Sequence, residues 1–443
     1  MPAPILLASE ANAAVFARFV ELAGGKKARL LVVAGQGSEK EWATRFAPAE
    51  VRLHRPGTSL PDLKGMTGIW FDTLPPGAMT PPSLPLAMGC AGPAISELGR
   101  LIPDAVVSRS EQARFPLEGQ VAFEVSPGAA LVVQGRELSV SGSGKVTIRL
   151  APGPSRAARA IDLSGKQVED LTALRRAARD RRENFPPRQV GTPVVPQGTL
   201  VIVGGGGMPS GLLERFVTLA GGKNAKIVVL PTAVPPLPML RDRMPEVMRK
   251  LGAQVTVLPG ITREVVESPE YLTAMREATG IWFGGGRQWR FVDSYEGTAL
   301  LPLMHDVLKR GGVIGGSSAG ATIQGDYLCR GGVFTNFDPA YEGYERGFAF
   351  LPGVAIDQHF AQRKRFTDMT ALMKLIPQYL GIGLDEATAI IVQGSRAEVV
   401  GKHQVHFYDA SRPPEKGKPD HVSLSAGQRY DLQARRILAD KEK

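Results

Sequence analysis

The sequence predicts an α/β protein built from two tandem, doubly wound domains, each with a mostly parallel sheet. Three observations support this prediction. The chain has 443 residues, which is enough for two to three domains of ordinary size. Apolar runs typical of buried strands alternate along the chain with amphipathic segments, as in sheets covered by helices. Finally, several segments of the first third of the chain recur in the same order further on.

The internal repeat consists of three pairs of matching segments. Residues 18–26, 68–71 and 129–135 match residues 215–223, 280–283 and 388–394. Three ordered matches indicate a duplicated domain. We expect a first copy over residues 1–150 and a second over 196–443. Residues 151–195 between them are expected to form one basic helix, begun by a capping box at Ser164 and Gln167, and a proline-rich linker.

In the second copy, short apolar runs that end in turns mark the expected strands. These runs are residues 200–203, 227–230, 255–258, 281–283 and 313–314. Residues 212–220 have apolar side chains at helical spacing and are expected to form a helix. Residues 389–409 are rich in β-branched residues and turns, which favours an antiparallel extension at the C-terminal end.

Composition and charge exclude several classes of protein. Hydrophobic residues make up 43% of the chain and charged residues 22%, as in a globular protein. Two cysteines, Cys90 and Cys329, exclude a disulfide framework and a cysteine-based zinc site. The net charge is +10, but no basic stretch is interleaved with aromatic residues, and no apolar run has the roughly 20 residues of a membrane span. We therefore expect neither a nucleic-acid nor a membrane partner.

The compartment stays open from the sequence. The N-terminal residues lack the basic and apolar regions of a signal peptide. This is expected of a cytoplasmic protein, and also of an exported one whose signal has already been removed.

One segment has the pattern of a nucleophile elbow. Gly316 and Gly320 flank Ser318 in a G-x-S-x-G motif, after the apolar residues 313–314 and before a segment that can begin a helix. The flanking positions must lack side chains because the chain folds back sharply around the nucleophile. A helix that begins here points backbone N–H groups at a developing oxyanion. A tight glycine turn between strand and helix is the alternative.

A serine nucleophile needs a base, and His359 is the favoured candidate. It ends residues 353–359, where an apolar run gives way to polar residues as at the C-terminal end of a strand, and doubly wound folds hold their sites there. The acid that orients the histidine is expected from Asp385 or Glu386. These two side chains point opposite ways in an extended chain, so only one of them can face the site.

Two other patterns predict no cofactor. His403 and His406 do not have the i, i+2 spacing of a pair on one strand face, so no metal ion is expected. Residues 204–207 are four glycines without the full G-x-G-x-x-G spacing, so no dinucleotide is expected. By contrast, residues 284–288 bring backbone N–H groups and polar side chains to the end of a predicted strand. We interpret them as an oxyanion or substrate loop, with a plain strand–helix turn as the alternative.

These segments together resemble the cyanophycinase and aspartyl dipeptidase (peptidase E) family. The resemblance covers residues 196–410 and is carried by residues 315–321, 351–365 and 381–389. It implies a serine-type hydrolase on a class I glutamine-amidotransferase-like (flavodoxin-like) α/β sandwich, without metal or cofactor. The substrate that it implies is a peptide or dipeptide-like molecule with an aspartyl or β-aspartyl group.

The resemblance also assigns a catalytic triad. Ser318 is the nucleophile, His359 the base and Glu386 the orienting acid. His359 takes the proton from Ser318, which attacks the scissile carbonyl. Relatives of the aspartyl dipeptidase type can place the acid between serine and histidine, so the lesser candidates for this role are Asp338, Glu342 and Glu345.

The oxyanion is expected to bind the backbone N–H of Ala319 and that of Gly285 or Gly286. Family resemblance places a further set of side chains in the substrate pocket: Gln288, Asp357, Gln358, Arg363 and Arg365. Two positions depart from the family. Arg287 stands where aspartate is frequent, and Asp368 lies near the place of a further arginine. Arg287 is expected to disfavour a cationic substrate group.

The first copy is expected to be catalytically inactive. Aligning the sequences puts Cys90 opposite Ser318 and Pro127 opposite Glu386, and the segment between them is about 31 residues shorter, so the whole histidine segment is expected to be missing. Such a copy would serve packing, shape the active cleft or pair with its sister. Pairing between chains as a homodimer is also left open.

Three other functions are considered. A binding or scaffold protein of the same fold would not need the intact serine, histidine and acid. An esterase or amidase of the α/β-hydrolase type places the acid before the histidine, whereas here His359 precedes Glu386. A class I glutaminase would need cysteine at Ser318.

Overall fold

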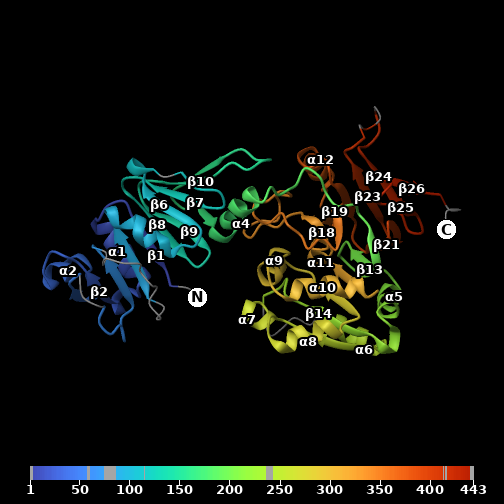
Figure 1. Cartoon of the computed structure of the whole chain (residues 1–443), viewed down its shortest axis with the longest axis horizontal. Coiled ribbons are helices and arrows are strands. Elements are labelled where there is room, and N and C mark those ends of the chain that lie inside the picture. Colours follow the sequence, from blue (N-terminus) through green and yellow to red (C-terminus); the bar gives the residue numbers. More distant parts are fainter. Residues whose placement is uncertain are drawn as a thin grey trace. The chain divides into compact units, whose positions relative to one another are not determined.

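The computed structural model describes residues 3–56, 60–73, 86–113, 115–235, 243–412, 414 and 417–439. The chain divides into two compact units, Met1–Phe185 and Pro186–Lys443. Both units combine helices with parallel and antiparallel strands, so the protein is α/β as predicted (Figure 1). Within the described ranges, no helix combines the length and hydrophobicity that a membrane span requires.

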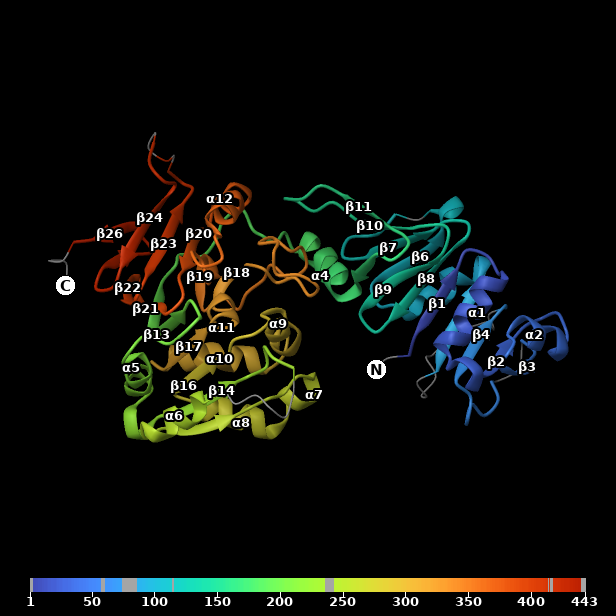
Figure 2. The same cartoon turned by 180° about the vertical axis from the view of Figure 1, so that it is seen from behind.

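The larger sheet of the first unit has the strand order β12-β9-β8-β1-β5-β4-β2-β3 (Figure 2). Its parallel part consists of β1 (Ile5–Ala8), β5 (Ala87–Ala91), β4 (Gly68–Phe71), β2 (Arg29–Val33) and β3 (Glu50–His54). The antiparallel part consists of β8 (Ala129–Gln134), β9 (Glu137–Gly142) and β12 (Val168–Asp170). Helices α1 (Ala13–Leu22) and α2 (Glu39–Arg45) contribute to the core on one face, where Phe19 packs edge-on against Trp70.

A smaller sheet of the first unit has the order β11-β10-β7-β6. Its strands are β6 (Ala105–Arg109), β7 (Val121–Val125), β10 (Val146–Leu150) and β11 (Arg159–Leu163). Residues of this sheet, of α3 (Ile95–Leu98) and of α4 (Leu171–Arg182) form one core with the other face of the larger sheet. Short 3-10 turns cover Gly25–Lys27, Gly92–Ala94, Gly99–Leu101, Ser110–Gln112 and, in the second unit, Gly222–Asn224.

Residues 151–195 are not only the helix and linker that the sequence predicted. They also contain β11 and β12, which pair with β10 and β9. The Ser164 N–H does donate to the side chain of Gln167, but this contact closes the turn between those two strands. The basic helix α4 begins later, at the N-cap Asp170, whose side chain accepts a hydrogen bond from the Ala173 N–H. The capping-box pattern therefore forms a turn here and does not begin a helix, because the segment that follows it is a strand.

The larger sheet of the second unit has the order β15-β14-β16-β17-β13-β21-β22-β25-β26. Its parallel strands are β13 (Val195–Val203), β14 (Lys226–Leu230), β15 (Gln254–Val257), β16 (Gly280–Phe283) and β17 (Val313–Ser317), close to the predicted runs. The antiparallel extension consists of β21 (Thr388–Gly394), β22 (Arg396–Gly401), β25 (Arg429–Asp431) and β26 (Arg436–Leu438).

Helices cover both faces of this sheet. Phe216 of α5 (Leu212–Leu219) packs edge-on against Trp282. Phe283 is the next residue of the strand, so its side chain points to the opposite face, where it packs against Phe291 of α9 (Trp289–Tyr295). The other helices are α6 (Met244–Lys250), α7 (Arg263–Val266), α8 (Pro269–Glu277), α10 (Leu300–Lys309), α11 (Ala319–Thr322) and α12 (Phe366–Leu375).

A second sheet of this unit has the order β18-β19-β20-β23-β24. Its strands are β18 (Gly325–Leu328), β19 (Leu351–Gln358), β20 (Leu380–Leu384), β23 (Gln404–Asp409) and β24 (His421–Ser425). The first three are parallel, and the last two continue the sheet in antiparallel order. Polar residues that follow β19 and β20 therefore lie at the same edge of this sheet.

The two units have corresponding strand orders. In the larger sheets, β3-β2-β4-β5-β1-β8-β9 corresponds to β15-β14-β16-β17-β13-β21-β22. Gly89 lies opposite Trp70 in the first unit, as Gly315 lies opposite Trp282 in the second. At both glycines a Cβ would collide with that tryptophan, so the absence of a side chain is a packing requirement. The registers therefore align the two units residue by residue.

Candidate active site

Ser318 lies at a sharp turn between β17 and α11. Its backbone has φ 57° and ψ −113°, a left-handed value of φ that residues other than glycine seldom adopt. The flanking glycines allow this turn, because a Cβ at Gly316 would collide with the backbone of Gly320, and one at Gly320 with the carbonyl of Phe283. The strand–turn–helix context of a nucleophile elbow is therefore present, at the C-terminal end of a parallel strand.

Three side chains form a continuous chain of hydrogen bonds at this turn. The Oγ of Ser318 lies 3.0 Å from Nε2 of His359, and Nδ1 of His359 lies 2.6 Å from Oε1 of Glu386. His359 follows β19 with a positive φ of 51°, and its N–H donates to the carbonyl of Gly204. Glu386 follows β20, and its N–H donates to the side chain of Gln362. The structure thus brings the three predicted residues together.

The four glycines that follow β13 make room for the histidine and the glutamate. A Cβ at Gly205 would overlap the ring of His359, and one at Gly206 would collide with the carboxylate of Glu386. The carbonyl of Gly205 also accepts the N–H of Ala387 at 2.8 Å. This steric role was not predicted from the sequence. Its signal was a glycine run after a predicted strand that fits no dinucleotide motif.

The alternative acids have other partners. Asp385 is buried and accepts hydrogen bonds from the N–H groups of Ala361 and Gln404 and, at 3.3 Å, from the His406 ring. Among the lesser candidates, Glu345 accepts from the hydroxyl of Tyr327, and Asp338 from a neighbouring backbone N–H. In the described ranges, no cluster of three or more His, Cys, Asp or Glu side chains is placed to hold a metal ion.

Burial sets the protonation of the histidine. It lowers the pKa of His359 below its ordinary value, because the charged imidazolium is poorly solvated there. The hydrogen bond to Glu386 opposes this shift, whereas the positive charges of Arg363 and Arg365 lower the pKa further. The imidazole is therefore neutral at neutral pH. With its proton on Nδ1 toward the glutamate, Nε2 can accept the proton of Ser318.

The two glycines that were predicted to bind the oxyanion have different neighbours. A Cβ at Gly285 would lie 3.5 Å from the Cβ of Ser318, so this glycine is directly beside the nucleophile. Gly286 has a φ of 139° and packs against Ala233. A Cβ at Gly286 would collide with the carbonyl of Ala233. Ala319 begins α11 immediately after the nucleophile. The backbone of Gly285 and that of Ala319 are therefore the pair next to Ser318.

Gln288 holds a neighbouring loop in place. Its side chain is buried, and its Nε2 donates to the carbonyls of Cys329 and Arg330 at 2.9 and 2.6 Å. Gln358 is buried as well, and its Oε1 has no hydrogen-bond partner in the described part of the chain. A substrate contact of either residue stays a prediction.

Asp357 and Arg365 belong to a buried ion network. Asp357 accepts from Nη1 of Arg365 at 2.6 Å and from Nε of Arg330 at 2.9 Å. Arg330 also contacts Asp368 at 2.7 Å, so the aspartate that replaces a family arginine has an arginine partner. These contacts lie within the protein, and a role of Asp357 and Arg365 toward substrate stays a prediction. The pairing could not be predicted from the sequence, where the only signal was a lone arginine after the apolar residues 327–329.

Arg363 and Arg287 are the exposed cations of the predicted pocket. Arg363 lies close enough to His359 for its charge to lower the pKa of that ring. Arg287 follows Gly286 on the loop after β16, and its N–H donates to the carbonyl of Ala233. Among the described residues, neither guanidinium has an ion-pair partner. Both are therefore free to meet an anionic group.

The strand registers correct the position of the nucleophile in the first unit. Gly89 of β5 corresponds to Gly315 of β17. The residue three positions after Gly89 is Gly92, and the residue three positions after Gly315 is Ser318, so Gly92 takes the place of Ser318. The backbone agrees, because Gly92 has a φ of 64° and Ser318 one of 57°. Cys90, which sequence alignment put opposite Ser318, instead corresponds to Gly316. It lies inside β5, and burial raises the pKa of its thiol well above the ordinary value.

The first unit also retains the strand that precedes the histidine. Strand β6 pairs with β7 in the same register as β19 pairs with β20. Ser110, the residue directly after β6, therefore takes the place of His359, the residue directly after β19. Pro127 takes the place of Glu386, as predicted. The expectation that the histidine segment is missing is therefore corrected. The second unit has additional residues around this strand, including β18 and α12.

Comparisons with known proteins found related peptidases. Residues 200–400 match the model of peptidase family S51. Over 202 residues the chain is 32% identical to the cyanophycinase of Geminocystis herdmanii, covering 45% of this chain and 74% of that protein. It is 26% identical over 285 residues to the cyanophycinase of Trichormus variabilis, with coverages of 58% and 95%. It is 29% identical over 199 residues to peptidase E of Salmonella paratyphi C, with coverages of 43% and 78%.

A solved structure adds a weaker likeness. The crystal structure of a peptidase from an acI-B1 actinobacterium superposes with a TM-score of 0.40 at 24% identity, covering 53% of this chain and 97% of that one. Together, the sequence matches define a serine-type peptidase, a hydrolase whose substrates are peptides or dipeptides. The chain belongs to peptidase family S51, which includes cyanophycinases and peptidase E.

Proposed function

We propose that the second unit hydrolyses an aspartyl or β-aspartyl peptide bond by acyl transfer through Ser318, His359 and Glu386, on a class I glutamine-amidotransferase-like fold. The observation that carries the proposal is the hydrogen-bonded chain of these residues, with distances of 3.0 and 2.6 Å, at an elbow of positive φ. A strained serine in contact with a neutral histidine is the arrangement of an activated nucleophile.

In this mechanism His359 acts as base and then as acid. Nε2 accepts the proton of Ser318 while Oγ attacks the scissile carbonyl, and the oxyanion binds the N–H groups of Gly285 and Ala319. The imidazolium then gives its proton to the leaving amine, and the acyl-enzyme forms. Water, deprotonated by His359, releases the acyl group. Glu386 holds the ring in the required tautomer and stabilises its charged form.

The aspartyl preference is proposed from charge and from the relatives. Those relatives are named cyanophycinase and peptidase E. Arg363 is exposed beside His359, so a substrate carboxylate can accept a bidentate pair of hydrogen bonds from it. A fluorophosphonate that labels Ser318, followed by a screen of α- and β-aspartyl dipeptides, tests this proposal. An unlabelled folded protein would contradict it.

The lowered pKa of His359 makes a prediction about pH. Only the neutral ring can accept a proton, so fluorophosphonate labelling of Ser318 slows as the pH falls through this pKa. Arg363→Gln removes a positive charge that lowers the pKa. The acidic limb of the labelling rate therefore moves to higher pH in this variant. Arg396→Gln, which changes an exposed arginine of β22, is expected to leave the limb in place. An unmoved limb in Arg363→Gln would refute the charge argument.

Arg287 predicts selection against cationic substrates. The wild-type enzyme is expected to cleave a neutral β-aspartyl dipeptide faster than β-Asp-Arg, because the exposed guanidinium repels a second positive charge. Arg287→Asp is expected to shift the ratio of kcat/KM toward β-Asp-Arg by roughly fivefold, which is about 1 kcal/mol at an exposed site. Arg276→Asp on α8 makes the same change of net charge and serves as control. A wild type that prefers β-Asp-Arg would count against the argument.

We further propose that the first unit is a catalytically inactive copy. Gly92, Ser110 and Pro127 occupy the three triad positions, so neither a base nor an acid is available there. The single histidine of residues 1–185 is His54 on β3. Two strands separate it from β5, a distance of about 14 Å at ordinary strand spacing.

Cys90→Ser is therefore expected to leave peptide hydrolysis within about twofold of wild type, or roughly 0.4 kcal/mol. The thiol is buried inside a strand and does not occupy the nucleophile position. The measurement is kcat/KM on the preferred dipeptide, beside the unfolding curve of the variant. A large loss of activity in a folded Cys90→Ser variant would show that the first unit takes part in catalysis.

A further inference from the structure

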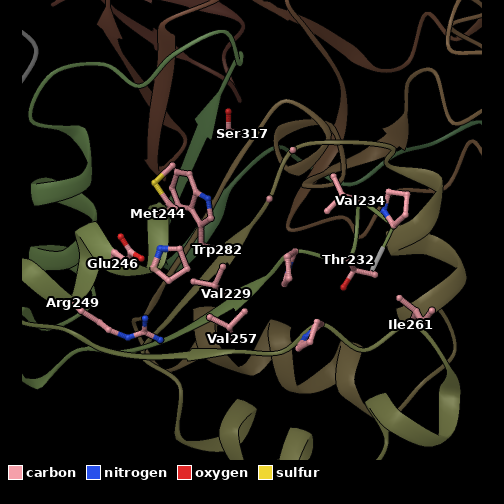
Figure 3. A pocket seen from close by; sticks show the side chains of 16 residues that line it. Val229, Thr232, Val234, Met244, Glu246, Arg249, Val257, Ile261, Trp282 and Ser317 are labelled. Carbon is pink, nitrogen blue, oxygen red and sulfur yellow. The ribbon is translucent and has the colours of Figure 1, made fainter. Parts of the chain in front are cut away.

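An apolar pocket opens next to the nucleophile. Its volume is about 630 Å³, within the range of roughly 300–1,000 Å³ that is typical of small-molecule sites. Most of its wall is aliphatic, proline or aromatic, as at Val257, Ile261 and Trp282, and its polar side chains include Thr232, Glu246 and Arg249. Gly284, Gly285 and Ser317 also line it, and Figure 3 shows Ser317 at one end of the pocket and Arg249 at the other.

The strand order places this pocket and the histidine on opposite sides of the nucleophile. Ser318 follows β17, whose neighbours in the sheet are β16 on one side and β13 on the other. His359 and Glu386 lie against the glycines that follow β13. The pocket instead lies over the ends of β14, β15 and β16. The triad and the pocket therefore approach Ser318 from different directions.

This arrangement separates the two halves of the substrate. His359 gives its proton to the leaving amine, so the amine has to lie on the β13 side of Ser318. In the acyl half, the aspartyl group is bonded to Oγ and stays beside Ser318, and the residue beyond it extends away from the histidine, past Gly285. There it meets the opening of the apolar pocket.

The geometry points to a binding subsite for an apolar group on the acyl side of the scissile bond. This inference rests on the proposed function, and it names the substrate more closely: an aspartyl peptide whose acyl half carries an aliphatic or aromatic residue. A dipeptide has no such residue, so the pocket would favour a longer substrate. Burying an apolar side chain among these wall residues is favourable in proportion to the area that leaves water.

Two fluorophosphonates test the subsite without any assumption about the peptide. One carries an ethyl chain and the other an octyl chain, and both phosphonylate only a reactive serine: its Oγ forms a bond to phosphorus and fluoride leaves. The octyl probe is expected to inactivate the wild-type protein about tenfold faster or more, because its methylenes enter the pocket. Equal rates for the two probes would overturn the subsite. Failure of both probes on folded protein would overturn the proposed function itself, and the two results are thus distinguishable.

Substitutions in the pocket wall test whether the faster reaction of the octyl probe depends on the pocket. Val257→Asp and Ile261→Asp each place a carboxylate in the wall, at side chains that are 37% and 44% exposed. Both are expected to bring the ratio of octyl to ethyl rates close to one. Val265→Asp is the matched control, since Val265 on α7 is 43% exposed and is not among the lining residues. An undiminished ratio in both pocket variants would contradict the assignment.

A pair of chromogenic substrates extends the test to peptide bonds. N-acetyl-aspartyl and N-(4-methylpentanoyl)-aspartyl p-nitroanilides differ only in the acyl group that should reach the pocket. The second is expected to have the higher kcat/KM in wild type, and Ile261→Asp is expected to abolish the difference. A preference for the acetyl compound would contradict the inference.

Discussion

Ser318→Ala is expected to abolish peptide hydrolysis while the second unit keeps its fold. The change removes one oxygen atom, whose hydrogen-bond partner is Nε2 of His359 at 3.0 Å. Without it no acyl-enzyme can form, and losses on the order of 10⁴- to 10⁶-fold in kcat are typical of such changes. His359→Ala is expected to cost about as much, because the serine then has no base.

The double variant Ser318→Ala/His359→Ala is expected to be no less active than either single variant, because the residues act as a unit. The measurements are kcat and kcat/KM on the preferred dipeptide, with an unfolding curve for each variant. Ser268→Ala, which removes a hydroxyl without a capping hydrogen bond before α8, is the control and is expected to be fully active. Losses that multiply in the double variant would contradict a triad.

Glu386→Gln distinguishes the two neighbouring acids. It removes the charge that faces Nδ1 of His359, and a loss on the order of 10⁴-fold is known for the equivalent change in a serine triad. Asp385→Asn instead replaces one of the two carboxylate oxygens that accept backbone N–H groups by an amide nitrogen, which cannot accept, so we expect it to affect stability more than catalysis.

The elbow could be predicted because it depends on local sequence. Glycines at two residues on either side of Ser318 are a steric requirement of the turn, and the structure places backbone atoms where their side chains would be. The strands were recognisable because parallel strands buried on both faces are continuous apolar runs. The segments around His359 and Glu386 follow such runs directly.

The alignment of the first copy failed because similarity of a few small residues does not determine strand register. The match of Gly-Cys-Ala-Gly with Ser-Ser-Ala-Gly placed Cys90 at the nucleophile. The register is fixed instead by packing of Gly89 against Trp70, and a shift of two residues preserves the alternation of faces. Contacts between elements distant in sequence were equally invisible, as for Arg330 with Asp357.

Asp357 is expected to be critical for the stability of the second unit. One buried carboxylate accepts from two buried arginines, Arg330 and Arg365. Burial lowers the pKa of the Arg365 guanidinium, and the charge of Asp357 opposes that shift. Removing the carboxylate leaves Arg365 without this charged partner, while Arg330 keeps Asp368. Breaking a buried pair in this way costs about 3–5 kcal/mol of unfolding free energy.

Asp357→Ala should therefore lower the free energy of unfolding of the second unit by about 3–5 kcal/mol, as measured by urea denaturation. Asp306→Ala removes an exposed ion pair with Lys309 and is expected to leave the transition unchanged. The double variant Asp357→Ala/Arg365→Ala should be less destabilised than the sum of its single variants, because it no longer contains the arginine that Asp357→Ala leaves unpaired. If Asp357→Ala unfolds at the same urea concentration as Asp306→Ala, the network does not stabilise the fold, and Asp357 is then available to contact the substrate.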